Sequence, residues 1–287
     1  MFNARSAVRL NSSAIRGEAE GNDGDFAVDD VFVAKSGGKQ ANASSNTFSL
    51  DKSIFQSKKI KAATENCQYC IDNEDKFLKH LMVSVSDKAC LLLPATTSLV
   101  EGHCYIVPLN HVTAVTSTDE DVFEEMQRYR KCLVNMFEEE DLDCVFMETV
   151  LHLGSHPHAV VECVPLEREL GDMAPIYFKK AMMESDVEWA INKRIVELSK
   201  VPGNSIRRAV PRGMPYFHVD FGANAGFAHV IEDESLFKKN FGLEILGGMM
   251  DSDPFLWRKP PKEDFSDQMK KCVEFSNKWR PFDWTEK

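Results

Sequence analysis

Two cysteines three positions apart, Cys67 and Cys70 in the stretch ENCQYC, constrain the fold of this chain more than any other feature. A Cys-x-x-Cys pair can hold one tetrahedral zinc ion from a single turn, and the remaining ligands then tie distant segments to that turn. The same pair can be a redox motif, but such a motif is expected at a strand-to-helix junction of a βαβ unit, and no such unit surrounds it. The competing interpretation is a pair of surface thiols. We predict a structural zinc site.

A zinc site needs two further ligands, and two stretches supply the best-placed histidines. His111 follows the strand-like segment in VPLNHV, and His156 and His158 lie in GSHPHAVVECVPL. We expect zinc at Cys67, Cys70, His111 and His158, with His156 as the alternative to His158. Lone histidines are expected to make ordinary hydrogen bonds rather than to bind metal, among them His80, His103, His218 and His229.

Composition limits the function classes. The 287 residues, of which 43% are hydrophobic, suffice for two domains with a core each. No stretch approaches about eighteen consecutive apolar residues, so we expect no membrane-spanning segment, and the first residues lack the apolar core of a secretory signal. The eight cysteines are then expected to stay reduced. A net charge of -11 argues against a protein that coats nucleic acid, so any such contact should be local.

The first 60 residues are rich in Gly, Ser, Asn and Asp, and they offer little apolar surface to offset the entropy cost of ordering. We predict a disordered tail or linker over residues 1–60. Residues 1–17 carry three Arg, three Ser and no acid, which is also typical of a mitochondrial transit peptide. Mitochondrial import is therefore the alternative to a disordered tail without a targeting role.

The ordered part should begin near ENCQYC and have an α+β fold. Apolar stretches predict a hairpin over residues 81–93, and further strands in HCYIVPL, CVFMETV and HAVVECVPL. The three-and-four spacing of apolar residues predicts an amphipathic helix over residues 118–137. We assign residues 61–175 to a first domain with an antiparallel sheet. A second, smaller α+β domain is expected over residues 176–287.

Within the second part, a helical pattern starts at about Ile176 or Ser185, strands are expected in GMPYFHVDFG and AGFAHVIE, and SDQMKKCVEFSNKW predicts a closing helix. Residues 193–212 include six basic residues and one acidic residue, so this stretch is positively charged within an acidic chain. Arginines there could meet phosphates while neighbouring aromatic rings stack on unpaired bases. The competing interpretation is a solvated helix and loop with the aromatic rings in a core. The candidate RNA-binding residues are Arg207, Arg208, Arg212, Tyr216 and Phe217.

Several long strings occur in a fixed order: NCQYC, EGHCYIVPLNH, ECVPL, GDMAPIYFKKA, PRGMPYFHVDFG, GFAHVIED and EILGGMMD. From about Thr64 to the end they resemble the C-terminal half of CwfJ-type (Cwf-nineteen-like) proteins, which are commonly longer. The resemblance implies a histidine-triad-like domain followed by a smaller CwfJ C-terminal domain. It also implies a nuclear role late in pre-mRNA splicing, near the intron lariat and its debranching enzyme.

Histidine-triad enzymes carry His-x-His-x-His along one strand, and the middle histidine attacks the α-phosphate. In one register His156 binds zinc, His158 attacks, and Val160 takes the third place. In the other, His158 is first and binds zinc, Val160 takes the nucleophile's place, and Glu162 is third. We prefer the second register, with a strand beginning at His158, because Pro157 cannot donate to a sheet ladder.

Both registers break the triad at Val160, whose side chain can neither attack phosphorus nor accept a proton. We therefore expect no catalytic residue and a non-enzymatic splicing factor with structural zinc. Its expected partners are spliceosomal proteins, the lariat debranching enzyme and branched intron RNA, and it is expected to contact no membrane. The alternatives are an active nucleotide hydrolase or transferase that uses His158, and a plain RNA-binding module.

Overall fold

The computed structural model describes residues 44–189 and 195–285. The chain divides into two units, Met1–Ser49 and Leu50–Lys287, and the sheet with the helices that pack on it belongs to the second. The stretch with the features of a transit peptide and most of the predicted tail lie outside the described residues.

The last part of the predicted tail is helical, which corrects the expectation for residues 44–60. Helix α1 spans Ser44–Glu65 and contains neither glycine nor proline. Its second half is rich in lysine and alanine, good helix formers that cost at most a few tenths of a kcal/mol each in a helix, about 0–0.3. The composition of the whole first 60 residues had concealed this shorter segment.

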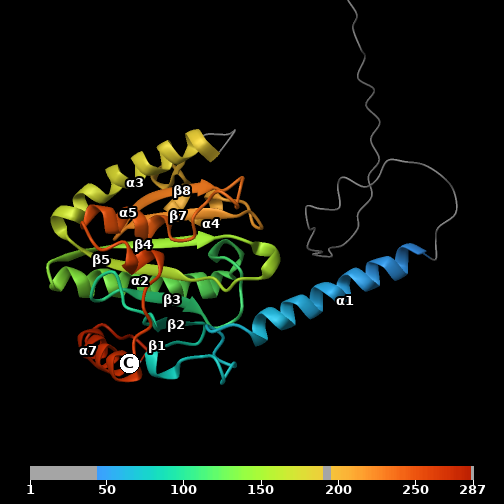
Figure 1. Cartoon of the computed structure of the whole chain (residues 1–287), viewed down its shortest axis with the longest axis horizontal. Coiled ribbons are helices and arrows are strands. Elements are labelled where there is room, and N and C mark those ends of the chain that lie inside the picture. The colour runs from blue at the N-terminus through green and yellow to red at the C-terminus, as the bar shows by residue number, and fades with distance from the viewer. Residues whose placement is uncertain (1–43, 190–194, 286–287) are drawn as a thin grey trace, which may run out of the picture. The chain divides into compact units, whose positions relative to one another are not determined.

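The strands form one antiparallel sheet in the order β1-β2-β3-β5-β4-β7-β8-β6, which confirms the α+β class. In Figure 1 the strands run from β8 at the top to β1 at the bottom. Their bounds are β1 Met82–Val85, β2 Ala89–Leu92, β3 Cys104–Pro108, β4 Leu142–Val150, β5 Val161–Glu167, β6 Ile195–Glu197, β7 Tyr216–Phe221 and β8 Asn224–Val230.

The predicted hairpin is confirmed as β1 and β2, and the expected strands correspond to β3, β4, β5, β7 and β8. The predicted start of β5 at His158 is wrong, because the strand begins at Val161. His156 has a left-handed backbone with φ of 51°, and residues 157–160 lie in a loop that leads into β5. There Ala159 N donates to Val112 O, in the loop after β3, at 2.7 Å.

The helix predicted over residues 118–137 is confirmed as α2, and the predicted closing helix is confirmed as α7. Helix α3 begins earlier than expected, at Arg168, and carries Pro175 inside it. Among the described residues, none of the helices is both long and apolar enough to cross a membrane. The helices after α1 are α2 Glu120–Glu139, α3 Arg168–Trp189, α4 Ile206–Ala209, α5 Phe241–Met249, α6 Phe255–Arg258 and α7 Phe265–Trp279.

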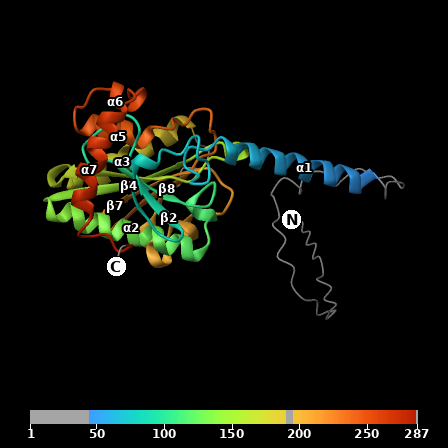
Figure 2. The ribbon, with the colours of Figure 1, turned by 90° about the horizontal axis from the view of Figure 1, so that it is seen from below.

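Helices cover both faces of the sheet. Alternation along β4 sends Phe146 to a core with α2 and α7, and sends Val145 and Met147 to a second core with α3, α5 and α6. Figure 2 shows strands between α2 below and α5 and α6 above. The apolar spacing of α2 places Met126 and Leu133 on its buried side.

The sheet is continuous across residue 175, where we placed a domain boundary. Strand β7, which follows that position, pairs with β4 from Val145↔Phe221 to Val150↔Tyr216. Residues on either side of the boundary therefore share both cores.

Candidate metal centre

Pairing of β3 with β5 brings two histidines together that are 47 positions apart in the sequence. Ile106 pairs with Val161, so the end of β3 lies beside the beginning of β5. His111 follows β3 and His158 precedes β5, and their rings lie 4.8 Å apart, edge to face. Register alone therefore places two imidazoles at one end of this strand pair.

The turn after α1 carries the two cysteines to the same place. Asn73 anchors this turn, because its Nδ2 donates to Cys67 O at 2.9 Å and its backbone N donates to Cys70 O at 3.0 Å. Phe77 is buried in a small core against the outer strands and holds the segment on the sheet. The backbone N–H of Tyr69 donates to Cys67 Sγ at 3.3 Å, which fixes the position of this sulfur.

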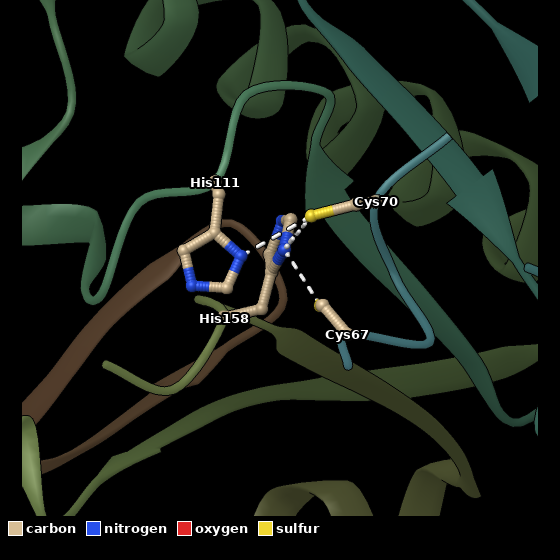
Figure 3. Close-up of side chains that lie close together, drawn as sticks. All are labelled: Cys67, Cys70, His111 and His158. Atoms are coloured by element: carbon tan, nitrogen blue, oxygen red, sulfur yellow. Dashed lines mark hydrogen bonds between the residues drawn. The ribbon is translucent and has the colours of Figure 1, made fainter. Parts of the chain in front are cut away.

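Four side chains converge from these three segments, and we call Cys67, Cys70, His111 and His158 the Cys/His cluster. Figure 3 shows them pointing toward one another. Cys67 Sγ lies 3.3 Å from His158 Nδ1, and Cys70 Sγ lies 3.2 Å from His111 Nδ1 and 3.5 Å from His158 Nδ1. All four ligand atoms lie within 4.8 Å of one another, and both cysteines are buried.

The outer nitrogen of each imidazole has an acceptor of its own. His111 Nε2 donates to the backbone O of His156 at 2.9 Å, and His158 Nε2 donates to Pro108 O at 2.9 Å. A carbonyl oxygen only accepts, so each Nε2 carries the proton and each Nδ1 keeps a lone pair directed at the sulfurs. Hydrogen bonds of this kind orient histidines that ligate metals.

Burial acts on the protonation of the cluster. It lowers the pKa of His158 to about 4, so the ring is neutral at neutral pH, as a ligand must be. Burial, with the neighbouring Cys67, raises the pKa of Cys70 to about 12. Two thiolates side by side in a buried site need a positive charge between them.

The geometry fits a tetrahedral metal ion. With Zn–S bonds of about 2.3 Å and Zn–N bonds of about 2.0 Å, ligand atoms of a tetrahedral site lie about 3.3–3.8 Å apart. The sulfur-to-nitrogen distances of 3.2–3.5 Å are close to this range. The Cys/His cluster can therefore bind a metal ion. The ring of His156 is not part of the cluster, to which this residue contributes its backbone oxygen as an acceptor.

The structure overturns the predicted stacking of bases on Tyr216 and Phe217. Both side chains are 0% exposed, and they point to opposite faces of β7. Tyr216 donates its hydroxyl hydrogen to the buried Glu148, and Phe217 packs against Phe241 with ring centroids 5.1 Å apart. Aromatic residues alternating along a central strand fill both cores, which is the competing interpretation of this stretch.

The three candidate arginines differ in their surroundings. Arg207 pairs with Glu120, donates to Thr118 O at 3.0 Å and lies over the ring of Phe123, so it links α4 to the start of α2. Arg208 is exposed and donates to Pro202 O at 3.2 Å, and Arg212 is exposed. RNA binding by these arginines stays a prediction.

A second buried polar group, which the sequence did not reveal, lies in β7. Asp220 Oδ2 lies 2.8 Å from Arg130 Nη2 and 3.0 Å from His218 Nε2, and its Oδ1 accepts from Gly226 N at 2.8 Å. We call Arg130, His218 and Asp220 the Asp220 network. Burial acts to raise the pKa of Asp220, but the charges of His218 and Arg130 outweigh it and lower that pKa well below its usual range.

The other histidines expected to make ordinary hydrogen bonds follow this expectation in part. His80 Nε2 lies 2.6 Å from Gln268 Oε1, and His218 contacts Asp220. His229 also has an interaction of its own. His103 departs from the expectation, because neither ring nitrogen has a hydrogen-bond partner within the described residues.

Comparison with known proteins places this arrangement in a family. The model described as "Protein similar to CwfJ C-terminal" matches residues 54–179, and the one described as "Protein similar to CwfJ C-terminus 2" matches residues 188–285. A solved structure of a hypothetical histidine triad nucleotide-binding protein from Sulfolobus tokodaii is 21% identical, with a TM-score of 0.29 over 35% of this chain and 69% of that one. This score is too low to bear on the fold.

Two curated relatives extend the match. The CWF19-like protein 2 of Danio rerio is 51% identical over 92% of this chain and 27% of its own length. The pre-mRNA-splicing factor cwf19 of Schizosaccharomyces pombe is 30% identical over 79% of this chain and 36% of its own length. This chain thus spans roughly a third or less of each relative. The two family regions together cover most of it and confirm the resemblance, so the chain belongs to the CwfJ family and carries that family's two C-terminal regions.

Proposed function

We propose that this chain is a non-enzymatic pre-mRNA splicing factor of the CwfJ type. It acts in the nucleus, late at the intron-lariat spliceosome, and in debranching or turnover of the lariat. Its partners are spliceosomal proteins and the lariat debranching enzyme, with branched intron RNA as a further one. The name of the fission-yeast relative supports the splicing role, and the resemblance of the long ordered strings to CwfJ-type proteins supports the late stage.

A structural zinc ion held by Cys67, Cys70, His111 and His158 is the second part of the proposal. When bound, the ion supplies the positive charge that stabilises two buried thiolates. The ligands come from three segments, so their joint coordination fastens the turn after α1 to the ends of β3 and β5. Four protein ligands also leave no open position for a water or a substrate, which is the mark of a structural site.

One observation carries the non-enzymatic part, namely that both nitrogens of His158 have partners. Nδ1 faces the two sulfurs, and Nε2 donates to Pro108 O. A histidine in this position has no lone pair free to attack phosphorus. Val160, two residues further on, offers no replacement, and the use of His158 as a nucleophile is therefore the weaker alternative.

The two-part organisation belongs to the proposal as well, with residues 61–175 and 176–287 as the two parts. The family models support a division inside α3, because one ends at residue 179 and the other begins at residue 188. Since β4 and β7 pair across this division, we expect the two parts to unfold together.

Metal analysis tests the site. Elemental analysis of the purified chain should find about one zinc per chain in the native protein and in His156→Ala, because the backbone oxygen of residue 156 survives the substitution. His158→Ala and His111→Ala should retain less than about half of that zinc. Metal-free native protein, or equal loss in all three variants, would contradict the assignment.

Co-purification tests the splicing role. Tagged native chain, recovered from nuclear extract, should enrich spliceosomal proteins and excised intron lariats, while the double variant Cys67→Ser/Cys70→Ser should recover fewer. His156→Ala is the matched control and should behave as the native chain. An absence of lariat enrichment with native chain would overturn the role, and a nucleotidyl adduct trapped on His158 by mass spectrometry would overturn its non-enzymatic form.

A further inference from the structure

Helix α1 carries a group of exposed lysines that the proposed function has not used. Lys58, Lys59 and Lys61 are exposed, as is every residue from 53 to 62, so this stretch packs against no core within the described part of the chain. Lys61 Nζ lies 3.7 Å from Glu65, whereas no ion pair among the described residues engages Lys58 or Lys59. Positive charge on α1 is therefore available to a partner.

The lysines share one side of α1 with exposed apolar residues. Ile54 precedes Lys58 by four positions and Lys61 by seven. Phe55 precedes Lys58 by three positions and Lys59 by four. These spacings bring side chains to the same side of a helix. Phe55 is 66% exposed and Ile54 is 44% exposed, so an accessible aromatic ring lies about one turn from the ammonium groups.

The charge of this stretch is opposite to that of the chain as a whole. Residues 52–61 contain four lysines and no acidic residue, whereas the net charge of the chain is -11. Like charges three positions apart on a helix repel each other, and a helix without tertiary packing is marginally stable in water. A bound polyanion would remove this repulsion and stabilise the helix. The acidic remainder of the chain repels a polyanion, so such binding is confined to a local surface.

We propose that residues 54–61 of α1 bind single-stranded RNA. The lysines contact phosphates, and the ring of Phe55 stacks on an unpaired base. The inference rests on the RNA partner of the proposed function and gives that partner a surface apart from the candidate arginines. Unlike the buried rings of Tyr216 and Phe217, the ring of Phe55 is accessible to a base. An acidic protein would meet the lysines but offers no base to this ring.

A salt titration tests the phosphate contacts on the whole 287-residue chain. Fluorescence anisotropy measures binding of a labelled single-stranded RNA of about twelve nucleotides. Each phosphate contact on a single strand contributes about -0.7 to the slope of log K against log salt concentration. Lys58→Gln/Lys59→Gln/Lys61→Gln should therefore make this slope less negative by about 2. Glutamine is nearly as good a helix former as lysine, so α1 keeps its helical propensity.

A matched triple variant separates α1 from the charge of the whole chain. It should show the slope of the native chain, because it changes the net charge equally but leaves α1 intact. It replaces three exposed lysines outside α1 with glutamine: Lys259, Lys262 and Lys270.

Substitution of the aromatic ring tests the base contact. Phe55→Ala should weaken RNA binding about fivefold or more at constant salt, because stacking is lost, and should leave the salt slope unchanged. Phe255→Ala removes a ring of α6 that is 67% exposed, and it should bind RNA as the native chain does. A polyglutamate peptide with the same number of charges as the RNA should bind the native chain at least about tenfold more weakly than the RNA.

The outcomes distinguish this inference from the splicing role. No binding of RNA by the native chain, equal salt slopes of the two triple variants, or equal affinities of the two phenylalanine variants would overturn it. Equal binding of polyglutamate would overturn it too and would assign α1 to an acidic protein. If the native chain enriched lariats and the α1 triple variant bound RNA normally, this inference alone would fail. If the native chain enriched no lariats but gave the expected RNA results, the splicing role alone would fail.

Discussion

The Cys/His cluster, at the ends of β3 and β5, and the Asp220 network, between α2 and β7, both gather polar side chains beside one sheet, but they balance charge differently. In the network, the carboxylate of Asp220 meets Arg130, His218 and a backbone N–H, so the chain supplies both signs of charge. In the cluster, two sulfurs and two lone pairs face one another, and the outer protons of both imidazoles point away to carbonyl oxygens. Converging electron-pair donors without a cation indicate a metal site, whereas paired charges indicate a structural network.

Removing the metal should have the largest effect. A strong chelator, or Cys70→Ala, should lower the free energy of unfolding by at least about 5 kcal/mol, since structural zinc contributes about 10–16 kcal/mol in small peptides and a whole domain is stable by about 5–15 kcal/mol. Urea denaturation with and without chelator measures this change. Cys132→Ala, a cysteine in α2 outside the cluster, should respond to the chelator as the native chain does. If the chelator left the free energy of unfolding of the native chain unchanged, the Cys/His cluster would not differ from the Asp220 network in needing a metal ion.

Breaking the Asp220 network should cost somewhat less. Asp220→Asn or Arg130→Met alone should lower the free energy of unfolding by about 3–5 kcal/mol, because each leaves a buried charge without its partner. The double variant should lose clearly less than the sum of the two, since both charges are then gone. A double-mutant cycle by urea denaturation checks this, and strict additivity would show that the pair is not coupled.

Glu162 sharpens the comparison, because it lines the same cavity as His158 and, within the described part of the chain, Lys239 is the charge that acts against its burial. Burial raises the pKa of Glu162 to about 7, against an effect of Lys239 that lowers it. Its pKa in the unfolded chain is about 4.3, so the unfolded state releases this proton first, and stability falls as pH rises from about 4.3 to about 7. Free energies of unfolding measured by urea denaturation across this range should show Glu162→Gln gaining about 3 kcal/mol relative to the native chain by pH 7.

Lys239→Gln is the counterpart of this prediction. It should increase the loss of stability with rising pH, because it removes the positive charge that lowers the pKa of Glu162. A native chain whose stability follows that of Glu162→Gln at every pH would show that this carboxyl group is not perturbed.

The smallest effect is expected at Arg208, which is exposed and belongs to neither group. Arg208→Ala should change the free energy of unfolding by less than about 0.5 kcal/mol in the same urea measurement. Tyr216→Phe is the buried contrast from the same predicted RNA site, and it should cost about 1–3 kcal/mol because Glu148 loses a hydrogen bond. If both substitutions changed the free energy of unfolding by similar amounts, burial would not distinguish Tyr216 from Arg208.

Some of the candidate site could be predicted from the sequence because its signals are local. Spacing brings Cys67 and Cys70 onto one turn, and His111 stands directly after a segment whose pattern predicts a strand. The preference for His158 over His156 depends on a strand that begins at His158, whereas β5 begins at Val161. The structure brings His158 into the cluster from a loop instead.

Other features had no local signal. The partners of the imidazole Nε2 atoms are backbone oxygens of Pro108 and His156, and every residue has such an oxygen. The Asp220 network joins positions 130 and 220, which a sequence pattern cannot connect. Alternation along a strand also does not tell which aromatic rings are buried when both faces of the sheet are covered, and this explains the error at Tyr216 and Phe217.

The sequence by itself determined the α+β class, most of the strands, the amphipathic helices α2 and α7, and three residues of the cluster, Cys67, Cys70 and His111, with His158 or His156 as the fourth. These follow from short-range periodicity and from the chemistry of cysteine and histidine. The tertiary structure decided which histidine nitrogen faces the sulfurs, which rings are buried, and that β7 joins the same sheet as β4. These outcomes depend on strand register and on packing between residues far apart in the chain, and neither is encoded in a local pattern.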